Sequence, residues 1–257
     1  MTMERVSQVV LILSGKGGVG KSTVCAQLAV AMAKQGKRVG VLDIDLCGPS
    51  LPLMFGLQDA KVTQGPAGWL PVRCPGPDHL FLMSIGFLLA QRDSAVIWRG
   101  PKKSAMIAQF VRDVDWGPLD VLLIDTPPGT SDEHITVVEV LRTCGAPVAA
   151  VLVSTPQALS VGDVRRQIAF CRKADVRVRG LVENMSGYVC PHCSECTNIF
   201  SKGGGESLAR LTDIPFLGCV PIDSDMGSLA DRGLALHSES QAAQQLSLIA
   251  DAVVDQR

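Results

Sequence analysis

A glycine-rich segment near the start of the chain restricts its fold more than any other feature. Residues 15–23 read Gly-Lys-Gly-Gly-Val-Gly-Lys-Ser-Thr and match the pattern G-x-x-x-x-G-K-[ST]. The apolar run Val9–Leu13 precedes this segment, and apolar residues at helical spacing follow it over Lys21–Gln35. A loop between a buried strand and a helix directs backbone N–H groups and the positive end of the helix at phosphate oxygens. The sequence therefore predicts a phosphate site on an α/β fold.

The rest of the chain repeats the order strand, turn, helix. Further strands are expected at residues 38–42, 79–84, 121–124, 147–153, 178–182 and 216–220, and helices at 101–114, 131–143, 157–173, 205–211 and 241–254. Hydrophobic residues make up 47% of the chain but aromatic residues only 4%, which is typical of aliphatic parallel sheets covered by helices. We expect one α/β domain over residues 1–257, with a mostly parallel sheet and helices on both faces. The Gly- and Pro-rich stretch Gln64–Pro77 is interpreted as a surface loop outside the sheet.

Two side chains of the glycine-rich loop have specific predicted roles. Lys21 should contact the β- and γ-phosphates of a nucleotide, and the Ser22 hydroxyl should ligate Mg²⁺. The expected ATP-binding loop consists of Gly15, Lys16, Gly17, Gly18, Val19, Gly20, Lys21, Ser22 and Thr23.

Three aspartates follow predicted strands and complete this site. Asp43 and Asp45 come after the second strand, and Asp125 ends the apolar run Val121–Ile124. The carboxyl ends of parallel strands form the edge of a sheet at which ligands bind. Asp125 suits the role of a Mg²⁺ ligand, directly or through water, and Asp43 is a second candidate. Asp45 is expected to orient the attacking water.

The loop also contains a second lysine, Lys16. A lysine at this position is the signature of the deviant P-loop group, the SIMIBI-class ATPases. This resemblance implies that Lys16 reaches across a dimer interface to the partner's nucleotide and acts there like an arginine finger. The alternative is an ordinary solvated surface lysine. Lys16, Lys21 and Asp45 are thus the expected catalytic residues.

Other segments resemble one branch of this class. They are Asp43–Ser50, Trp98–Pro101, Asp125–Asp132, Glu183–Gly187 and Cys190–Cys193. Together with the loop they look like the Mrp/nucleotide-binding-protein family of iron–sulfur cluster scaffold ATPases, from Val9 to beyond Pro221. The cysteine segment most resembles the shorter of two eukaryotic cytosolic paralogues. The longer paralogue carries an N-terminal extension with four further cysteines, for which the residues before Val9 leave no room.

The resemblance implies further nucleotide contacts. Asn184 matches the family's adenine-contacting asparagine, and Pro221 and Asp223 match the loop that passes the base. Gly129 would sense the γ-phosphate through its backbone N–H.

Cys190, Cys193 and Cys196 are separated by two-residue gaps, a spacing shared by zinc knuckles and iron–sulfur sites. Three thiolates are one short of a four-thiolate site. A zinc site could recruit His192 or a distant cysteine, whereas a two-fold dimer brings two thiolates from each chain to one axis. The resemblance selects Cys190 and Cys193, in a loop at about residues 187–198, as ligands of a [4Fe–4S] cluster shared with the dimer partner. The role of Cys196 stays open.

The family resemblance implies an ATP-hydrolysing scaffold that requires ATP and Mg²⁺. It would assemble a labile [4Fe–4S] cluster at a dimer interface and transfer it to cytosolic or nuclear apo-proteins or their adaptor. The dimer partner would be a second copy or the longer paralogue. Nine cysteines, most of them isolated, indicate a reducing compartment, with the cytosol expected first and the nucleus second. The net charge of −1 and the short apolar run Leu80–Ala90 predict neither a nucleic-acid partner nor a membrane span.

Two other classes of ATPase share these motifs. A ParA/MinD-like positioning ATPase with a structural zinc knuckle would use a basic surface or a basic C-terminal helix. The tail His237–Arg257 instead contains three acidic residues and one basic residue. A reductase like the nitrogenase iron protein takes its cluster ligands one each from two distant segments, unlike the pair Cys190 and Cys193.

Overall fold

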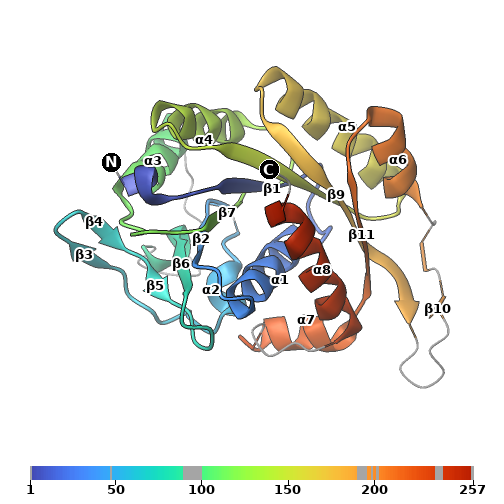
Figure 1. Ribbon diagram of the computed structural model, residues 1–257, viewed down its shortest axis with the longest axis horizontal. Helices are drawn as coiled ribbons and strands as arrows, with labels where there is room; N and C mark the ends of the chain where they lie inside the picture. The colour runs from blue at the N-terminus through green and yellow to red at the C-terminus, as the bar shows by residue number, and fades with distance from the viewer. Residues whose placement is uncertain are drawn as a thin grey trace.

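A nine-stranded, mostly parallel sheet forms the centre of the computed structural model (Figure 1). The structure describes residues 2–46, 48–88, 100–189, 196–197, 199–200, 203–234 and 240–255. The strands are β1 (Val9–Ser14), β2 (Val39–Asp43), β3 (Thr63–Gly65), β4 (Gly68–Leu70), β5 (Val72–Arg73), β6 (Leu80–Ser84), β7 (Val121–Asp125), β8 (Val148–Ser154), β9 (Arg177–Val189), β10 (Cys196–Thr197) and β11 (Phe216–Ile222). The helices are α1 (Lys21–Lys34), α2 (Leu51–Met54), α3 (Gly100–Asp113), α4 (Asp132–Thr143), α5 (Ala158–Lys173), α6 (Gly204–Thr212), α7 (Ser224–Asp231) and α8 (Gln241–Asp255).

The first strand lies in the middle of the sheet. The strand order is β10-β9-β8-β1-β7-β2-β6-β5, with β11 paired beside β9. Val9 of β1 is in register with Leu122 of β7 on one side and with Val148 of β8 on the other, both in parallel pairs. All six residues of β1 are buried, because helices cover both of its faces.

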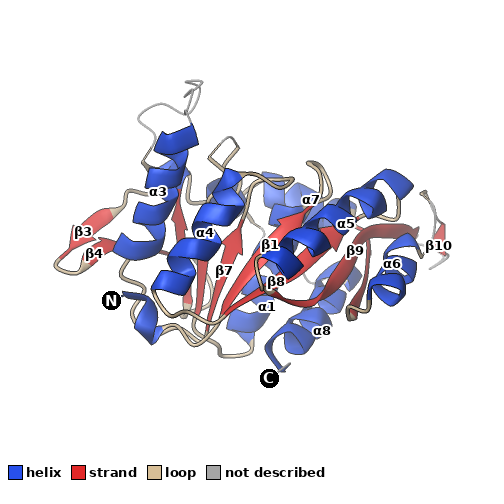
Figure 2. Cartoon of the chain, turned by 90° about the horizontal axis from the view of Figure 1, so that it is seen from above, coloured by secondary structure: helices blue, strands red, loops and turns tan. Residues whose placement is uncertain are grey.

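Helices cover the two faces of the sheet, as the sequence predicted (Figure 2). Helices α3, α4, α5 and α6 lie on one face, and α1 and α8 lie together on the other (Figures 1 and 2). Alternate residues of β1 enter two separate cores: Leu11 packs with the α3–α6 face, and Val10 and Ile12 pack with the α1–α8 face. The mostly parallel α/β fold is therefore confirmed. No helix among the described residues combines the length and the apolar character that a bilayer crossing requires.

The seven predicted strands and six predicted helices are all present, with bounds that differ by a few residues. The exception in length is β9, expected over 178–182, which runs on to Val189 because β11 supplies a parallel partner as far as Tyr188. The short helices α2 and α7 were not expected.

The prediction of a surface loop at Gln64–Pro77 is wrong. This stretch contributes to a hairpin of β3 and β4, followed by β5, which pairs antiparallel with β6 at the edge of the main sheet. Trp69 of the hairpin packs edge-on against Phe110 of α3, with ring centroids 5.4 Å apart. An aromatic contact from a distant helix therefore orders a segment whose own composition is typical of a loop.

Candidate nucleotide site

The glycine-rich loop connects β1 to α1, as predicted. Gly20 immediately precedes α1 and has a φ of 79°, a left-handed conformation that favours glycine. A Cβ atom there would lie 2.3 Å from the Nδ2 atom of Asn184, so the position also lacks room for any side chain. The loop thus requires glycine here for two independent reasons.

A cavity of about 240 Å³ lies against this loop. Its lining includes the side of the loop from Lys16 to Thr23, together with Ser14, Asp45, Ser50, Met54 and Pro128. Of the residues with predicted nucleotide roles, Gly15, Asp43, Asp125, Gly129, Asn184, Pro221 and Asp223 do not line it. The cavity is therefore lined by most of the phosphate loop and by Asp45, and the other predicted residues are not part of its lining.

Lys21, Ser22 and Asp125 form one buried polar cluster. Both oxygens of the Asp125 carboxylate are occupied: Lys21 Nζ donates to Oδ1, and Ser22 Oγ donates to Oδ2 at 2.6 Å. Lys21 Nζ also lies 3.3 Å from Ser22 Oγ. The sequence predicted that these three residues would meet at the carboxyl end of the sheet, and the structure brings them together.

The cluster fits a magnesium ion bound together with a nucleotide. The Ser22 hydroxyl and the Asp125 carboxylate are oxygen donors, which Mg²⁺ prefers. The described residues contain no group of three or more His, Cys, Asp or Glu side chains arranged to hold a metal ion on their own. Mg²⁺ typically takes one or two protein oxygens and completes its shell with phosphates and water, so a small donor set is the expected one.

Asp43 and Asp125 are neighbouring buried carboxyl groups. They are register partners on the parallel strands β2 and β7, and neither is exposed. Burial raises the pKa of Asp43, and the nearby Asp125 carboxylate raises it further. Ser84 Oγ donates to Asp43 Oδ2 at 3.0 Å, and the Asp45 N–H donates to Oδ1 at 3.1 Å, which offsets part of this effect. Burial likewise raises the pKa of Asp125, against the opposing charge of Lys21.

Replacing Asp43 with asparagine is expected to stabilise the metal-free protein. The pKa of Asp43 rises to about 8 in the folded state, so folding loses stability as the pH rises from the unfolded carboxyl value toward 8. The variant has no such charge and should gain about 1–2 kcal/mol above pH 8 but nothing near pH 4, since its amide hydrogens also need partners. Urea unfolding of both proteins from pH 4 to 9, with chelator present, measures the difference. A gain that does not depend on pH would contradict the assigned cause.

Lys16 lies at the edge of the cavity and is half-buried. Its Nζ donates to Oε1 of Gln157, which precedes α5, at 3.1 Å. Within one chain, then, Lys16 has a neutral partner that holds the side chain near the loop. The predicted contact with a partner's nucleotide requires this hydrogen bond to be exchanged for another.

Gly129 is tied to the end of β1 instead of facing the cavity. Its N–H donates to the Ser14 carbonyl at 2.9 Å, and its φ is 81°. A backbone contact with a γ-phosphate, as predicted, would need this hydrogen bond to open.

Gln167 of α5 is a site residue that the sequence did not indicate. Its Nε2 donates to the Ser14 carbonyl at 3.1 Å and to the Gly129 carbonyl at 2.7 Å, and the side chain is buried. A single glutamine on an amphipathic helix carries no sequence signal for this role, because the contact depends on how α5 packs over β1.

Asn184 contacts the loop itself. Its Nδ2 donates to the Val19 carbonyl at 2.9 Å, and the side chain is buried on β9. Pro221 lies in β11, and the Asp223 side chain caps α7 by accepting from the Met226 N–H at 2.8 Å. The predicted adenine contacts therefore remain predictions, and for Asp223 the structure adds a capping role.

Most of the cysteine segment lies outside the described residues, including Cys190 and Cys193. The structure describes the two ends of this cysteine segment. Strand β9 ends at Val189, and the backbone of Cys196 in β10 pairs antiparallel with Val189. The chain thus leaves β9 directly before Cys190 and returns beside it at Cys196. Of the isolated cysteines, Cys25, Cys74 and Cys171 are buried, as expected of core thiols.

Sequence comparison finds relatives over nearly the whole chain. The family model described as ParA, NUBPL iron-transfer P-loop NTPase, matches residues 5–254. The cytosolic Fe-S cluster assembly factor nubp2 of Xenopus laevis is 57% identical over 253 residues, which cover 97% of this chain and 93% of the relative.

Two solved structures share the fold. The nucleotide-binding protein of Archaeoglobus fulgidus in complex with ADP is 41% identical with a TM-score of 0.81, over 94% of this chain and 92% of the other. The cell division ATPase MinD of Pyrococcus furiosus has a TM-score of 0.68 over 96% and 98% of the two chains. It is only 20% identical, so it supports the fold alone.

Proposed function

Because the chain belongs to the NUBPL iron-transfer P-loop NTPase family, we propose that it is an ATP-hydrolysing scaffold for iron–sulfur clusters. It would assemble a labile [4Fe–4S] cluster between two subunits, on Cys190 and Cys193 of each, and pass it to apo-proteins. The cluster is cargo in this proposal, while ATP and Mg²⁺ drive the cycle. The name of the Xenopus relative, a cytosolic Fe-S cluster assembly factor, supports the iron–sulfur role and a cytosolic site of action.

One structural feature carries the proposal: a single strand leads from the phosphate loop to the cysteine segment. Asn184 of β9 is hydrogen-bonded to the Val19 carbonyl of the loop, and β9 ends five residues later at Val189, next to Cys190. Five fully extended residues would span roughly 17 Å. The path here is shorter, because Met185 and Gly187 have φ of 57° and 81° and the register with β11 shifts between Asn184 and Tyr188. In this proposal, a change in the loop on nucleotide exchange reaches the cluster ligands through this short segment of β9.

The nucleotide would be held by the loop from Gly15 to Thr23. In this proposal Lys21 neutralises the β- and γ-phosphates, and Ser22 and Asp125 hold Mg²⁺, which bridges phosphate oxygens and offsets their charge. Asp45, at the cavity wall, orients the attacking water. The Archaeoglobus relative is in complex with ADP, which supports nucleotide binding by this chain.

The proposal also covers the domain boundaries, the dimer partner and the proteins that receive the cluster. We infer that residues 1–257 act as one ATPase domain that pairs with a second copy or with a longer paralogue bearing four further cysteines. The recipients are apo iron–sulfur proteins or their adaptor in the cytosol, and also in the nucleus.

The cysteine variants test the cluster site. Cys190→Ala and Cys193→Ala should each lower bound iron and sulfide to background after anaerobic reconstitution, because two thiolates per chain are needed for four in the dimer. Both variants should still fold and bind nucleotide. A cluster that binds only the dimer favours dimerisation by mass action. In sedimentation experiments, both variants should therefore contain a larger fraction of monomer than wild type.

Two controls accompany these variants. Cys196→Ala should have a milder effect, and Cys144→Ala, on a half-buried isolated cysteine, should have none. Full iron retention in Cys193→Ala would move the ligand role to Cys196. A monomeric wild type that binds zinc and ignores iron and sulfide would favour the positioning ATPase with a zinc knuckle. A brown dimer that cycles its redox state without losing iron to an apo-acceptor would favour the reductase.

Gln167→Leu is expected to reduce the preference for ATP over ADP. Its amide holds the carbonyls of Ser14 and Gly129, so the variant leaves two acceptors with fewer partners and frees the segment that should respond to the γ-phosphate. The loss of these bonds should also destabilise the fold by about 1–3 kcal/mol. Affinities for ATP and ADP, measured by titration calorimetry, give the ratio. An unchanged ratio in a destabilised protein would mean that Gln167 is only structural.

A further inference from the structure

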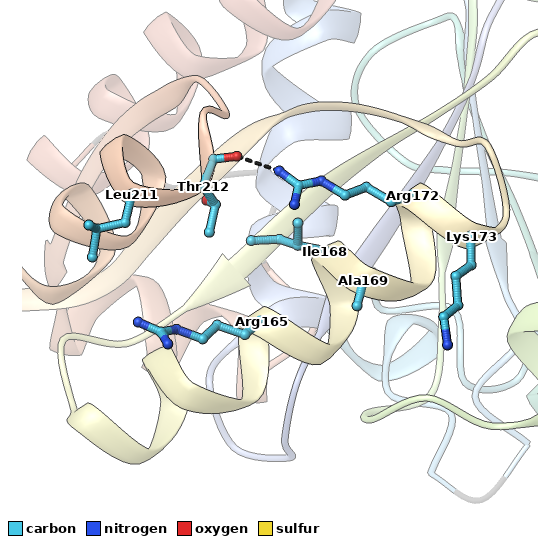
Figure 3. A pocket seen from close by; sticks show the side chains of 7 residues that line it. All are labelled: Arg165, Ile168, Ala169, Arg172, Lys173, Leu211 and Thr212. Atoms are coloured by element: carbon cyan, nitrogen blue, oxygen red, sulfur yellow. Dashed lines mark hydrogen bonds between the residues drawn. The ribbon is translucent and has the colours of Figure 1, made fainter.

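Helices α5 and α6 form a groove on the face of the sheet that they share (Figure 3). Its volume is about 610 Å³, within the range of about 300–1,000 Å³ that is usual for ligand sites. Arg165 and Arg172 extend from α5 toward α6 on either side of Ile168, and Leu211 faces them from α6 (Figure 3). A second cavity of about 400 Å³ shares Arg165 and Leu211, so the groove continues along the two helices.

The floor of the groove is apolar. Ile168 of α5 and Leu208 of α6 are buried at its base. Leu211 is 75% exposed at the rim, although it is a large aliphatic side chain. An apolar floor with an exposed leucine beside it favours a ligand that inserts a hydrophobic side chain.

The rim of the groove is basic. Arg165 and Lys173 are exposed, and the described part of the chain places no carboxylate in an ion pair with either. Their neighbour Arg166 is paired with Asp163 at 3.2 Å, and Arg210 of α6 is paired with Glu206. Arg172 Nη2 donates to the Thr212 carbonyl at 2.6 Å, which fixes one wall of the groove. The rim of the groove is thus positively charged, although the net charge of the chain is −1.

We propose that this groove docks an acidic protein segment that carries a large apolar residue. The apolar side chain would enter over Ile168 and Leu208 beside Leu211, and carboxylates of the segment would pair with Arg165 and Lys173. Charge complementarity of this kind steers association and selects among partners. The groove is separate from the nucleotide cavity, so docking here goes beyond the proposed ATPase cycle.

Other polyanions fit this groove less well. Single-stranded nucleic acid binds where bases stack on aromatic side chains, and none of the described residues that line the two cavities is aromatic. An anionic membrane favours several apolar side chains on one protruding helix face. Here Leu211 is exposed, but Ile168 and Leu208 are recessed between two helices. A protein segment meets both the recessed floor and the charged rim.

Selection of peptides tests the proposal. A phage library of short random peptides is first passed over the Arg165→Glu variant to remove the peptides that bind it. The remaining peptides are then selected for binding to the full wild-type chain. We expect the enriched peptides to carry Asp or Glu next to a large apolar residue. A synthetic labelled peptide of the enriched sequence should bind Arg165→Glu and Leu211→Ser about tenfold or more weakly than wild type, by fluorescence anisotropy.

Matched changes elsewhere on the surface control for charge and hydrophobicity. Lys34→Glu reverses an exposed charge at the end of α1, and Leu248→Ser replaces a leucine of α8 that is 64% exposed. Both should bind the peptide like wild type, and all four variants should bind ADP normally. The proposal is overturned if no peptide distinguishes wild type from Arg165→Glu, or if the enriched peptides lack carboxylates. It is also overturned if an oligonucleotide or phosphatidylserine vesicles bind through Arg165 while the peptides do not.

Discussion

Replacing Lys21 with alanine is expected to abolish the binding of Mg·ATP. The side chain is only 6% exposed and is the cation paired with Asp125 at the start of α1. Without it, Mg²⁺ alone would offset the charge of the phosphates beside the buried carboxylate, so the affinity should fall by a factor of about 100 or more, which is about 2.8 kcal/mol. Fluorescent nucleotide titration measures the loss.

The same substitution should also weaken the fold, because it leaves Asp125 as a buried acid without its ion-pair partner. Breaking such a pair costs about 3–5 kcal/mol. Lys21→Gln is the matched variant, since its amide can still donate to Asp125 but carries no charge. Lys21→Gln should remain folded by circular dichroism and still fail to bind nucleotide. Wild-type affinity in folded Lys21→Gln would exclude Lys21 as the phosphate ligand.

Replacing Lys16 with alanine is expected to leave nucleotide binding partly intact and to suppress turnover. In the proposed dimer, this lysine acts on the partner's nucleotide in the transition state, and removing a charge of that kind costs about 10³-fold or more. Single-turnover hydrolysis measures the effect even where the basal rate is low.

Gln157→Ala provides the control for Lys16. It removes the 3.1 Å hydrogen bond that holds Lys16 within its own chain but keeps the lysine. Turnover should be equal to that of wild type or higher, because Lys16 is then released for the contact between subunits. Equal losses in Lys16→Ala and Gln157→Ala would instead assign the pair a structural role within one chain.

The class of fold was predictable, because apolar runs and glycine turns alternate along the chain. What the sequence could not indicate was pairing that depends on a distant partner. The pairing of β9 with β8 ends at Glu183, and beyond it β11 provides the parallel partner at Asn184 and Tyr188. Likewise β5 and the β3–β4 hairpin are ordered by β6 and by Phe110.

The candidate site divides in the same way. Lys21, Ser22 and Asp125 belong to motifs whose spacing already determines their geometry, and the structure brings them together. Gln167 contacts the end of β1, at Ser14, from a helix more than a hundred residues away, so only the packing of α5 reveals it. The resemblance places Asp223 in the loop that passes the base, and this stays a prediction. The structure adds that its side chain caps α7, a local role that the resemblance did not include.

The central position of β1 has a consequence for how the protein is made. Strand β1 leaves the ribosome well before both of its sheet partners, Val121–Asp125 and Val148–Ser154. At about 5–20 residues per second, β1 waits roughly 7–30 s for β8 to be synthesised. Contacts so distant in sequence also slow folding after synthesis. A nascent chain that stops before Ser154 should therefore hold the glycine-rich segment as an unformed coil, and it would gain the ability to bind nucleotide only late in translation.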